Sequence, residues 1–501
     1  MSEFDLAVIG GGIGGVGVAR DAAGRGLKVF LAEQGDLGNA TSSASTKLIH
    51  GGLRYLEHFQ FRLVRESLRE RERLMVIAPH LVRPMRFVMP HVEGMRPAWK
   101  MRIGLALYDW FGRTPGLPGS RALDLSDDPA GAPLAPGFRR GFEYADCVTD
   151  DARLVIANAI GARELGAVIR PRTRCVSARR EAGRWELILQ AGGKREIVRA
   201  RALVNATGAA VARVQETILR QKPGTGVRLV KGSHIVIPRL HAHDRAYILP
   251  NDDGRFVFAI PFADDFTLVG TTDVDVSSDS AEVSASSEEI LYLCRAVSRF
   301  FRTPVKPSAV KWTFAGVRTL VDDGRHKASE VTRDYWIDAA GKYGEPPLVS
   351  IYGGKLTTYR SLAEKVVDRL KHWMNIGPVW TATEPLPGGD LGSGGLDELI
   401  AAIQTVHPFV APALARRLAR SYGTRVWTLL GGAARLEELG QRIAGDLHER
   451  ELDYLRREEW AATADDVLWR RTKLGLSASA ADVEGLHAAF AGTTPAQKLA
   501  G

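Results

Sequence analysis

The sequence contains little cysteine and no long apolar run. Three cysteines occur among 501 residues, at Cys147, Cys175 and Cys294, without a CxxC pair. This spacing fits neither a disulfide framework nor a zinc cluster, so we expect buried thiols, a reducing compartment and no metal. No window holds the roughly 20 apolar residues that cross a bilayer. The first residues, MSEFDLAVIGGG, do not resemble a secretory leader. Any membrane contact is therefore expected to be peripheral.

A basic tail is absent as well. Lysine and arginine number 67 against 58 aspartates and glutamates, a net charge of +9 that is spread along the chain. Such an excess suits nucleic acid, an anionic membrane face or an anionic substrate. Because the sequence has neither an aromatic RNA-binding strand nor a clustered basic segment, we expect no nucleic-acid partner.

The N-terminal residues predict a strand–helix–strand unit. Residues 4–10 predict a buried strand, 13–25 a helix with small residues on its packing face, and 27–33 a second strand that ends in an acid. This order is typical of a parallel, doubly wound sheet.

The turn of this unit predicts a dinucleotide site. Gly10 permits the tight turn, Gly12 lets the backbone approach a pyrophosphate, and Gly15 lets helix and strand pack closely. The pyrophosphate would lie at the positive end of the helix dipole. Glu33 stands where an acid binds the ribose hydroxyls of an adenosine.

Two later segments favour FAD over a nicotinamide nucleotide. Residues 203–208 (LVNATG) predict a strand that ends in a small-residue turn at Thr207 and Gly208. Residues 353–358 (GGKLTT) follow the strand 348–352 and open another helix. The dipole of such a second helix can stabilise the negative charge that develops at the flavin N1/C2 carbonyl on reduction.

Between these segments the sequence alternates as strands do, and later it becomes helical. Strands are predicted at 184–190, 198–206, 227–237, 246–250, 255–262 and 266–271. We expect them to form a second, largely antiparallel sheet inserted into the nucleotide domain. A charged helix is predicted at 61–77 and a long loop at 112–137. After the break PLPGGDLGSGG, helices are predicted at 397–405, 410–421 and 434–455.

The predicted fold class is α/β (α+β overall). A Rossmann-like FAD-binding domain would span residues 1–385, with an inserted antiparallel-sheet substrate domain at roughly 50–150 and 225–330. A helical C-terminal domain would span 386–501.

Six motifs between residues 4 and 390 resemble those of the aerobic, FAD-dependent glycerol-3-phosphate dehydrogenases. They are ATSSASTKLIHGGLRYL at 40–56, RGFEYADC at 140–147, KGSHIVIP at 231–238, GTTDV at 270–274, GVR at 316–318 and GGKLTTYR at 353–360. One departure is the threonine after Arg318, where the family pattern has proline. The calcium-binding loop of the mitochondrial members is absent, so the chain resembles the bacterial type.

The resemblance implies a fold related to the amino-acid oxidases and oxidation of sn-glycerol 3-phosphate to dihydroxyacetone phosphate, with hydride passing from C2 to flavin N5. It implies electron transfer to a membrane quinone, ubiquinone or menaquinone. It also implies a peripheral position on an anionic membrane surface, the inner, cytoplasmic face of the cytoplasmic membrane. We expect FAD to be noncovalent and the protein to be a homodimer. The alternative is an FAD oxidase or dehydrogenase of another small anionic amino or hydroxy acid.

The resemblance also assigns residues. Those that would contact FAD are Gly10, Gly12, Gly15, Glu33, Ser42, Ser43, Thr46, Lys47, Thr207, Gly208, Gly353, Gly354, Leu356 and Thr357. Those that would surround the substrate are Arg54, Tyr55, His234, Arg318 and Lys355.

Residue chemistry supports the substrate set. Guanidinium groups suit a phosphate dianion, and both Arg54 and Arg318 follow glycine turns, although each could also be a surface arginine. Lys355 at a helix N-terminus opposes the helix dipole, which favours a functional contact with the substrate or the reduced flavin. His234 is proposed as general base or hydroxyl-orienting group, because imidazole titrates in the useful range. A satisfied core histidine is its alternative role, and His50 is a second candidate base.

Residues 95–111 (MRPAWKMRIGLALYDWF) combine basic, aromatic and aliphatic side chains. They predict either a basic amphipathic helix on an anionic bilayer or a helix packed on the core.

Overall fold

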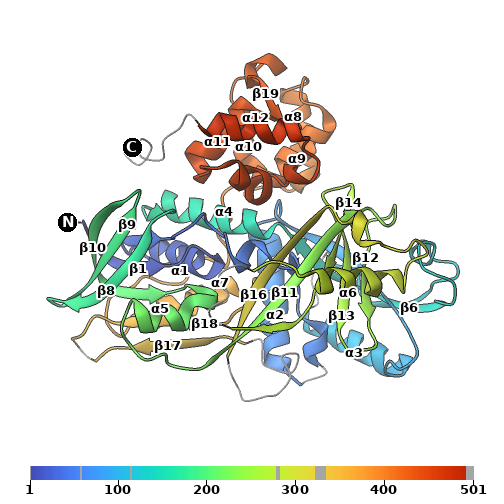
Figure 1. Cartoon of the computed structure of the whole chain (residues 1–501), viewed down its shortest axis with the longest axis horizontal. Coiled ribbons are helices and arrows are strands. Elements are labelled where there is room, and N and C mark those ends of the chain that lie inside the picture. The colour runs from blue at the N-terminus through green and yellow to red at the C-terminus, as the bar shows by residue number, and fades with distance from the viewer. Residues whose placement is uncertain are drawn as a thin grey trace.

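The computed structural model of the chain describes residues 2–56, 59–112, 116–277, 283–321, 334–342 and 344–491. Two sheets form one body, and a mainly helical C-terminal domain lies above them in Figure 1. The three cysteines are buried and free. Within the described residues no helix is long and apolar enough to cross a membrane, and no group of three or more side chains could hold a metal ion.

The first sheet is built around the N-terminal strand. Its order is β17 (Trp336–Ala340), β18 (Leu348–Tyr352), β10 (Lys194–Asn205), β1 (Ser2–Ile9), β2 (Val29–Ala32) and β7 (Val168–Arg170). These neighbours are parallel except for β17, which is antiparallel to β18. Helix α1 (Ile13–Gly24) packs against α4 (Asp151–Glu164) and α7 (Tyr359–Leu370). The predicted strand–helix–strand unit is therefore confirmed.

Two strands that we assigned to the second sheet belong to the first. Strand β9 (Arg184–Ala191) pairs with β8 (Arg174–Glu181) and with the first half of β10, both antiparallel. The end of β10, at residues 203–205, lies between β1 and β18. Alternation predicted the strands correctly but not their sheet, because a half-exposed antiparallel arm and an inserted sheet share the same polar–apolar period.

The second sheet is largely antiparallel, as predicted. Its main path is β15 (Val274–Val276), β11 (Val227–Pro238), β14 (Phe266–Gly270), β13 (Phe256–Phe262), β12 (Ala246–Pro250), β4 (Val82–Pro90), β6 (Arg140–Thr149) and β3 (Leu48–Ile49). Strand β16 (Trp312–Val321) pairs with β11 as an additional neighbour. Strand β5 (Arg121–Asp124) pairs with β6, so the predicted loop at 112–137 contains a short strand.

Helices cover both faces of the second sheet. Alternate residues of β4 point to opposite faces, with Val88 packed in the cluster that contains α6 (Ser287–Ser298). Phe87 belongs to the cluster on the other face, which contains α2 (Phe61–Ile77) and α3 (Ala98–Phe111). The charged helix predicted at 61–77 is confirmed as α2.

The C-terminal domain has a core of its own. Its helices are α8 (Gly395–Val406), α9 (Pro412–Tyr422), α10 (Val426–Leu430), α11 (Glu449–Glu459) and α12 (Ala480–Ala491). The continuous helix predicted at 434–455 is wrong. This segment forms a 3₁₀ turn and a hairpin of β19 (Arg442–Ala444) and β20 (Leu447–His448), and α11 begins only afterwards. Gly440 at φ +80° and Gly445 at φ +55° adopt a left-handed backbone that interrupts a helix.

Candidate active site

The turn between β1 and α1 requires glycine at two positions. Gly10 has φ +111°, and a Cβ there would lie 2.5 Å from the Ala206 oxygen. A Cβ on Gly15 would lie 1.9 Å from the Gly10 oxygen. Gly12 is the N-cap of α1 and offers no capping side chain. Ile13 N donates a 3.0 Å hydrogen bond to Ser42 Oγ, and Gly12, Ile13 and Gly14 line the adjoining cavity. The positive end of the α1 dipole therefore faces a space that can take an anionic group.

Glu33 follows β2 and is held by the backbone of two glycine turns. Its Oε2 accepts a hydrogen bond from Gly11 N and its Oε1 one from Gly35 N, both at 2.7 Å. Burial raises the pKa of Glu33, and the hydrogen bonds from Gly35 and Gly11 act in the opposite direction. The carboxylate is therefore fixed in place at the edge of the nucleotide turn.

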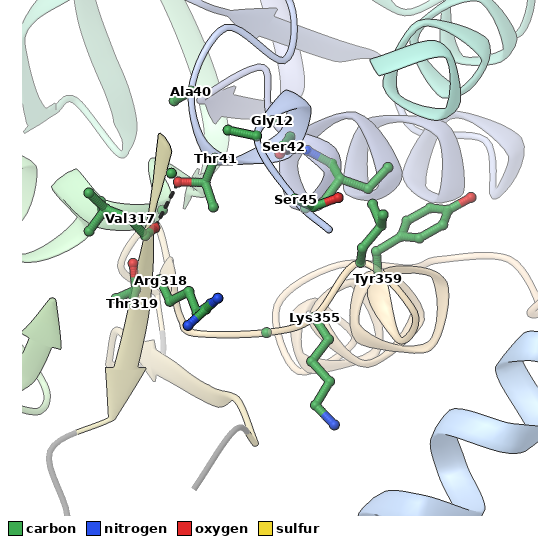
Figure 2. A pocket seen from close by; sticks show the side chains of 18 of the residues that line it. Gly12, Ala40, Thr41, Ser42, Ser45, Val317, Arg318, Thr319, Lys355 and Tyr359 are labelled. Carbon is green, nitrogen blue, oxygen red and sulfur yellow. Dashed lines mark hydrogen bonds between the residues drawn. The ribbon is translucent and has the colours of Figure 1, made fainter. Parts of the chain in front are cut away.

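A cavity of about 480 Å³ extends from this turn. Its walls include most of residues 38–46, the turn after β10, residues 316–320 of β16 and the turn at 353–357. Figure 2 shows Gly12 and Ser42 on one side, with Arg318 projecting from β16 toward the turn that carries Lys355. Thr41 donates a 2.7 Å hydrogen bond to the Val317 oxygen and so joins the loop to β16 (Figure 2).

A second cavity of about 580 Å³ adjoins the first and shares Thr46, His50, Tyr55 and Arg318 with it. At its polar end lie Thr271, Asp273, Arg255 and Arg318. Its apolar walls include Leu53, Leu56, Phe59, Phe61, Trp99, Ile103 and Leu107. The second cavity is therefore amphipathic, and Arg318 joins its polar end to the first cavity.

His234 lies on β11 in the wall of the first cavity. Its Nε2 shares a 3.0 Å hydrogen bond with Thr46 Oγ1, and its ring stacks on Phe314 at a centroid distance of 4.8 Å. A Cβ on Gly270, its neighbour on β14, would lie 2.0 Å from the imidazole. Burial, with the positive charges of Arg318 and Lys47, lowers the pKa of His234 well below 6.5. The imidazole is neutral at pH 7 and is able to accept a proton.

The other predicted substrate residues lie close by. Arg318 forms an ion pair with Asp273 and donates a 3.0 Å hydrogen bond to Thr271 Oγ1. The Lys355 ammonium lies 3.7 Å from the centre of the Tyr55 ring. The pKa of His50 is lowered to about 4, chiefly by burial; Asp146 acts against this shift, and the positive charges of Lys355 and Arg71 add to it. The Arg54 side chain lies outside the described part of the structure, so its proposed role stays a prediction.

Residues 5–360 match the family model of FAD-dependent oxidoreductases. The chain belongs to this family. Residues 379–491 match the model for the C-terminal domain of alpha-glycerophosphate oxidase. No match tests the predicted domain boundary at 385.

Several relatives are similar over nearly the whole chain. The glycerol-3-phosphate dehydrogenase of Pseudomonas aeruginosa is 52% identical over 475 residues, covering 94% of this chain and 92% of the relative. The aerobic glycerol-3-phosphate dehydrogenase of Escherichia coli is 48% identical over 481 residues, or 95% of each chain. The D-erythritol 1-phosphate dehydrogenase of Brucella abortus is also 48% identical, over 472 residues and 94% of each chain.

A solved structure has the same architecture. The glycerol-3-phosphate dehydrogenase of Bacillus halodurans, complexed with FAD, matches with a TM-score of 0.71 at 28% identity and covers 94% of this chain and 86% of that one. FAD is therefore the cofactor of this flavoenzyme. The glycine turn, the N-terminus of α1 in the cavity wall and the fixed Glu33 carboxylate fit a dinucleotide.

Most of the residues predicted to contact FAD line the first cavity of the flavoenzyme. They are Gly10, Gly12, Glu33, Ser42, Thr46, Thr207, Gly208, Gly353, Gly354, Leu356 and Thr357. Gly15 instead lets α1 pack on the turn.

Ser43 and Lys47 are not among the lining residues. The Lys47 ammonium contacts Asp151 Oδ1 at 2.7 Å and the Ser43 oxygen at 3.0 Å, and Asp151 also accepts a 2.7 Å hydrogen bond from Ser45 Oγ. These contacts hold the loop at residues 41–46, which lines the cavity, against α4; the Lys47 side chain itself does not face the cavity.

The sequence interpretation missed Thr271 and Asp273, which stand beside Arg318 in the second cavity. Both belong to the motif GTTDV, so the signal was present in the sequence. Their pairing with Arg318 could not be inferred, because it joins positions 45 and 47 residues apart.

Proposed function

We propose that this flavoenzyme oxidises sn-glycerol 3-phosphate to dihydroxyacetone phosphate and passes the electrons to a membrane quinone. The names of the relatives from Pseudomonas and Escherichia support this substrate. The observation that carries the proposal is the position of Arg318. Its guanidinium group lines both the cofactor cavity and the polar end of the adjoining cavity. A phosphate bound there would leave the rest of a three-carbon substrate within reach of the cofactor.

FAD, when bound, would supply the two-electron acceptor, with the hydride on C2 passing to flavin N5. The chain has to hold the phosphate and to accept the proton of the C2 hydroxyl. Arg318 and Arg54 would bind the phosphate. Lys355, whose ammonium lies over the Tyr55 ring, would contact the substrate next to them. Holding the substrate at two charged points fixes the orientation of C2, which lowers the entropic barrier to reaction.

His234 would accept the hydroxyl proton through Thr46. Thr46 lines both cavities and bonds the imidazole at 3.0 Å, whereas His234 lines only the first cavity. A hydroxyl both donates and accepts, so Thr46 can take a proton from the substrate while passing its own to His234. The lowered pKa of His234 keeps the imidazole neutral before turnover. It also makes the protonated imidazole acidic, so that His234 releases the proton again after the reaction.

The apolar walls of the second cavity support a quinone as electron acceptor. They lead from Tyr55 and His50 to Phe59, Trp99 and Ile103, which are exposed at the protein surface. A basic amphipathic helix at that surface suits an anionic membrane, where quinones are dissolved. We therefore propose that the enzyme lies on the inner face of the cytoplasmic membrane.

Anaerobic titration tests the proposed substrate. Glycerol 3-phosphate should bleach the yellow flavin, and lactate and glycine should not. If only a hydroxy or amino acid bleaches it, the proposal is wrong. D-Erythritol 1-phosphate is included because of the Brucella relative. In air, a low yield of hydrogen peroxide combined with rapid reduction of a soluble quinone analogue would support the quinone, and stoichiometric peroxide would contradict it.

A further inference from the structure

The second cavity contains one acid in basic surroundings. Arg96, Lys100, Arg255 and Arg318 line it, and Asp273 is the only aspartate or glutamate among its described lining residues. The Asp273 side chain is 16% exposed and forms an ion pair with Arg318. A site for a phosphate dianion gains nothing from an acid that offsets its arginine, so the position of Asp273 calls for another explanation.

The loop that carries Asp273 is fixed by buried hydrogen bonds. Thr272 Oγ1 donates to Glu289 Oε1 at 2.7 Å and accepts from Ser233 N at 2.9 Å. Glu289 Oε2 also contacts the Lys231 ammonium at 2.8 Å. Strand β14, which precedes the loop, pairs with β11 at His234. The Asp273 carboxylate is therefore held in a defined position beside Arg318 and next to the strand that carries His234.

Gly232 makes room for this arrangement. A Cβ at Gly232 would lie 2.6 Å both from Arg318 Nη2 and from Thr271 Oγ1. The guanidinium group thus lies close to the β11 backbone at Gly232 and contacts both Thr271 and Asp273. A small ligand bound to Arg318 in this cavity would therefore lie beside Asp273 as well.

We propose that Asp273 determines specificity by selecting substrates with a neutral hydroxymethyl group beside the oxidised carbon and excluding those with a carboxylate there. This inference rests on the proposed function and names its substrate class, polyol phosphates. An ionised carboxylate only accepts hydrogen bonds, so it binds a hydroxyl group and repels a second carboxylate. Like charges in contact discriminate strongly between otherwise identical ligands.

Two achiral ketones form a matched pair for the test. Dihydroxyacetone phosphate and 3-phosphohydroxypyruvate differ only in a hydroxymethyl group against a carboxylate. The affinity of each for the oxidised full-length holoenzyme is measured by the perturbation of the flavin absorption spectrum, without turnover. In Asp273→Asn, which keeps an oxygen that can accept from Arg318, we expect the preference for dihydroxyacetone phosphate to fall by about 10- to 100-fold.

Asp252→Asn is the control for net charge, because Asp252 lies on an exposed turn in an ion pair with Arg299 and does not line the cavity. It should leave the preference unchanged. An unchanged preference in Asp273→Asn would overturn the inference and leave Asp273 only as a support for Arg318. Equal loss of preference in both variants would overturn it too. If glycerol 3-phosphate fails to bleach the wild-type flavin, the proposed function fails separately, and the binding measurement still reports on Asp273.

Discussion

At the scale of single residues, the imidazole of His234 is confined on three sides. Phe314 stacks on its ring, Gly270 leaves space that no other residue would leave, and Thr46 bonds Nε2. Among the described atoms, Nδ1 has no hydrogen-bond partner. A satisfied core histidine would have both nitrogens bonded when buried. The environment therefore favours a role in proton transfer over a purely structural one.

His234→Gln should slow flavin reduction by glycerol 3-phosphate about 10²- to 10⁴-fold, because the hydroxyl proton loses its acceptor. Substrate affinity should change little, since the phosphate contacts remain. Anaerobic stopped flow measures both, as the limiting rate and the concentration at half-saturation. His50→Gln serves as the comparison, since His50 lines both cavities and is the second candidate. A normal limiting rate of flavin reduction in His234→Gln, together with a slow one in His50→Gln, would instead identify His50 as the acceptor of the hydroxyl proton.

At the scale of elements, the β1–α1 turn combines tight packing with a helix N-terminus that lines the first cavity. Gly15→Ala forces a Cβ against the backbone oxygen of Gly10, which cannot move as a flexible side chain would. We expect loss of bound FAD and a lower melting temperature. Gly14→Ala is a matched control, because a Cβ there meets no atom within 4 Å and alanine is the better helix former. Flavin content and thermal melting measure both variants. If both retain FAD equally, the turn is more adaptable than its geometry indicates.

Helix α3 presents an apolar stripe to solvent. Trp99, Ile103 and Trp110 are 60%, 60% and 71% exposed, and their spacing places them on one side of the helix. The opposite side, with Leu105 and Tyr108, is buried against the second sheet. Both predicted roles of residues 95–111 are therefore compatible with one helix: one side packs on the core, and the other is available to a membrane.

The double variant Trp99→Glu/Ile103→Glu should lose binding to vesicles that contain phosphatidylglycerol, because two charges replace the apolar contact. Co-sedimentation measures the bound fraction, and salt should weaken the binding of the wild type. Val406→Glu on α8 is a control, since Val406 is equally exposed but belongs to the C-terminal domain. Undiminished sedimentation of the double variant would exclude α3 as the membrane contact.

The elements also show what sequence could and could not predict. The glycine turn and Glu33 were predictable because their partners are set by local strand–helix geometry. The direction of Lys47 was not, because its partner Asp151 is 104 positions away and only the packed fold brings α4 to the loop. The hydrogen bond between Thr46 and His234 was not predictable for the same reason, because it joins residues 188 positions apart in the sequence. Alternation likewise predicted β9 and β10 as strands, but it could not determine their sheet, which we assigned wrongly.

At the scale of the whole molecule, the C-terminal domain lies over α4 (Figure 1). Trp469 stacks on Trp312 at 4.6 Å, and Trp312 in turn packs on Phe314, which covers His234. Buried ion pairs join the two parts, among them Arg153 with Glu459. The docked domain therefore supports the wall of the site through Trp469 and Trp312. Its orientation depends on buried ion pairs, whose charges need each other because no water reaches them.

Asp36 is the acid at the centre of this docking surface. It contacts the guanidinium groups of Arg471 at 2.7 Å and Arg470 at 2.6 Å. Burial alone would raise the pKa of Asp36, but the two arginines outweigh it and lower the pKa to about 2, from 3.8. A pKa lowered by folding stabilises the folded state above the unfolded value, and this contribution is lost as the pH falls from 3.8 through 2.

Asp36→Asn should therefore destabilise the protein at neutral pH by about 3–5 kcal/mol, because buried Arg471 loses its nearest counter-ion and keeps the more distant Glu459 Oε2, 3.8 Å away. The difference from wild type should narrow as the pH falls below 4, since Asp36 becomes protonated there in the unfolded wild-type chain, whereas in the folded protein its pKa is about 2. Thermal unfolding followed by tryptophan fluorescence between pH 3 and 7 measures this, with Asp453→Asn on α11 as an exposed control. A difference that stays constant over this range would show that the Asp36 charge does not hold the domain, and that packing around Trp469 and Trp312 does.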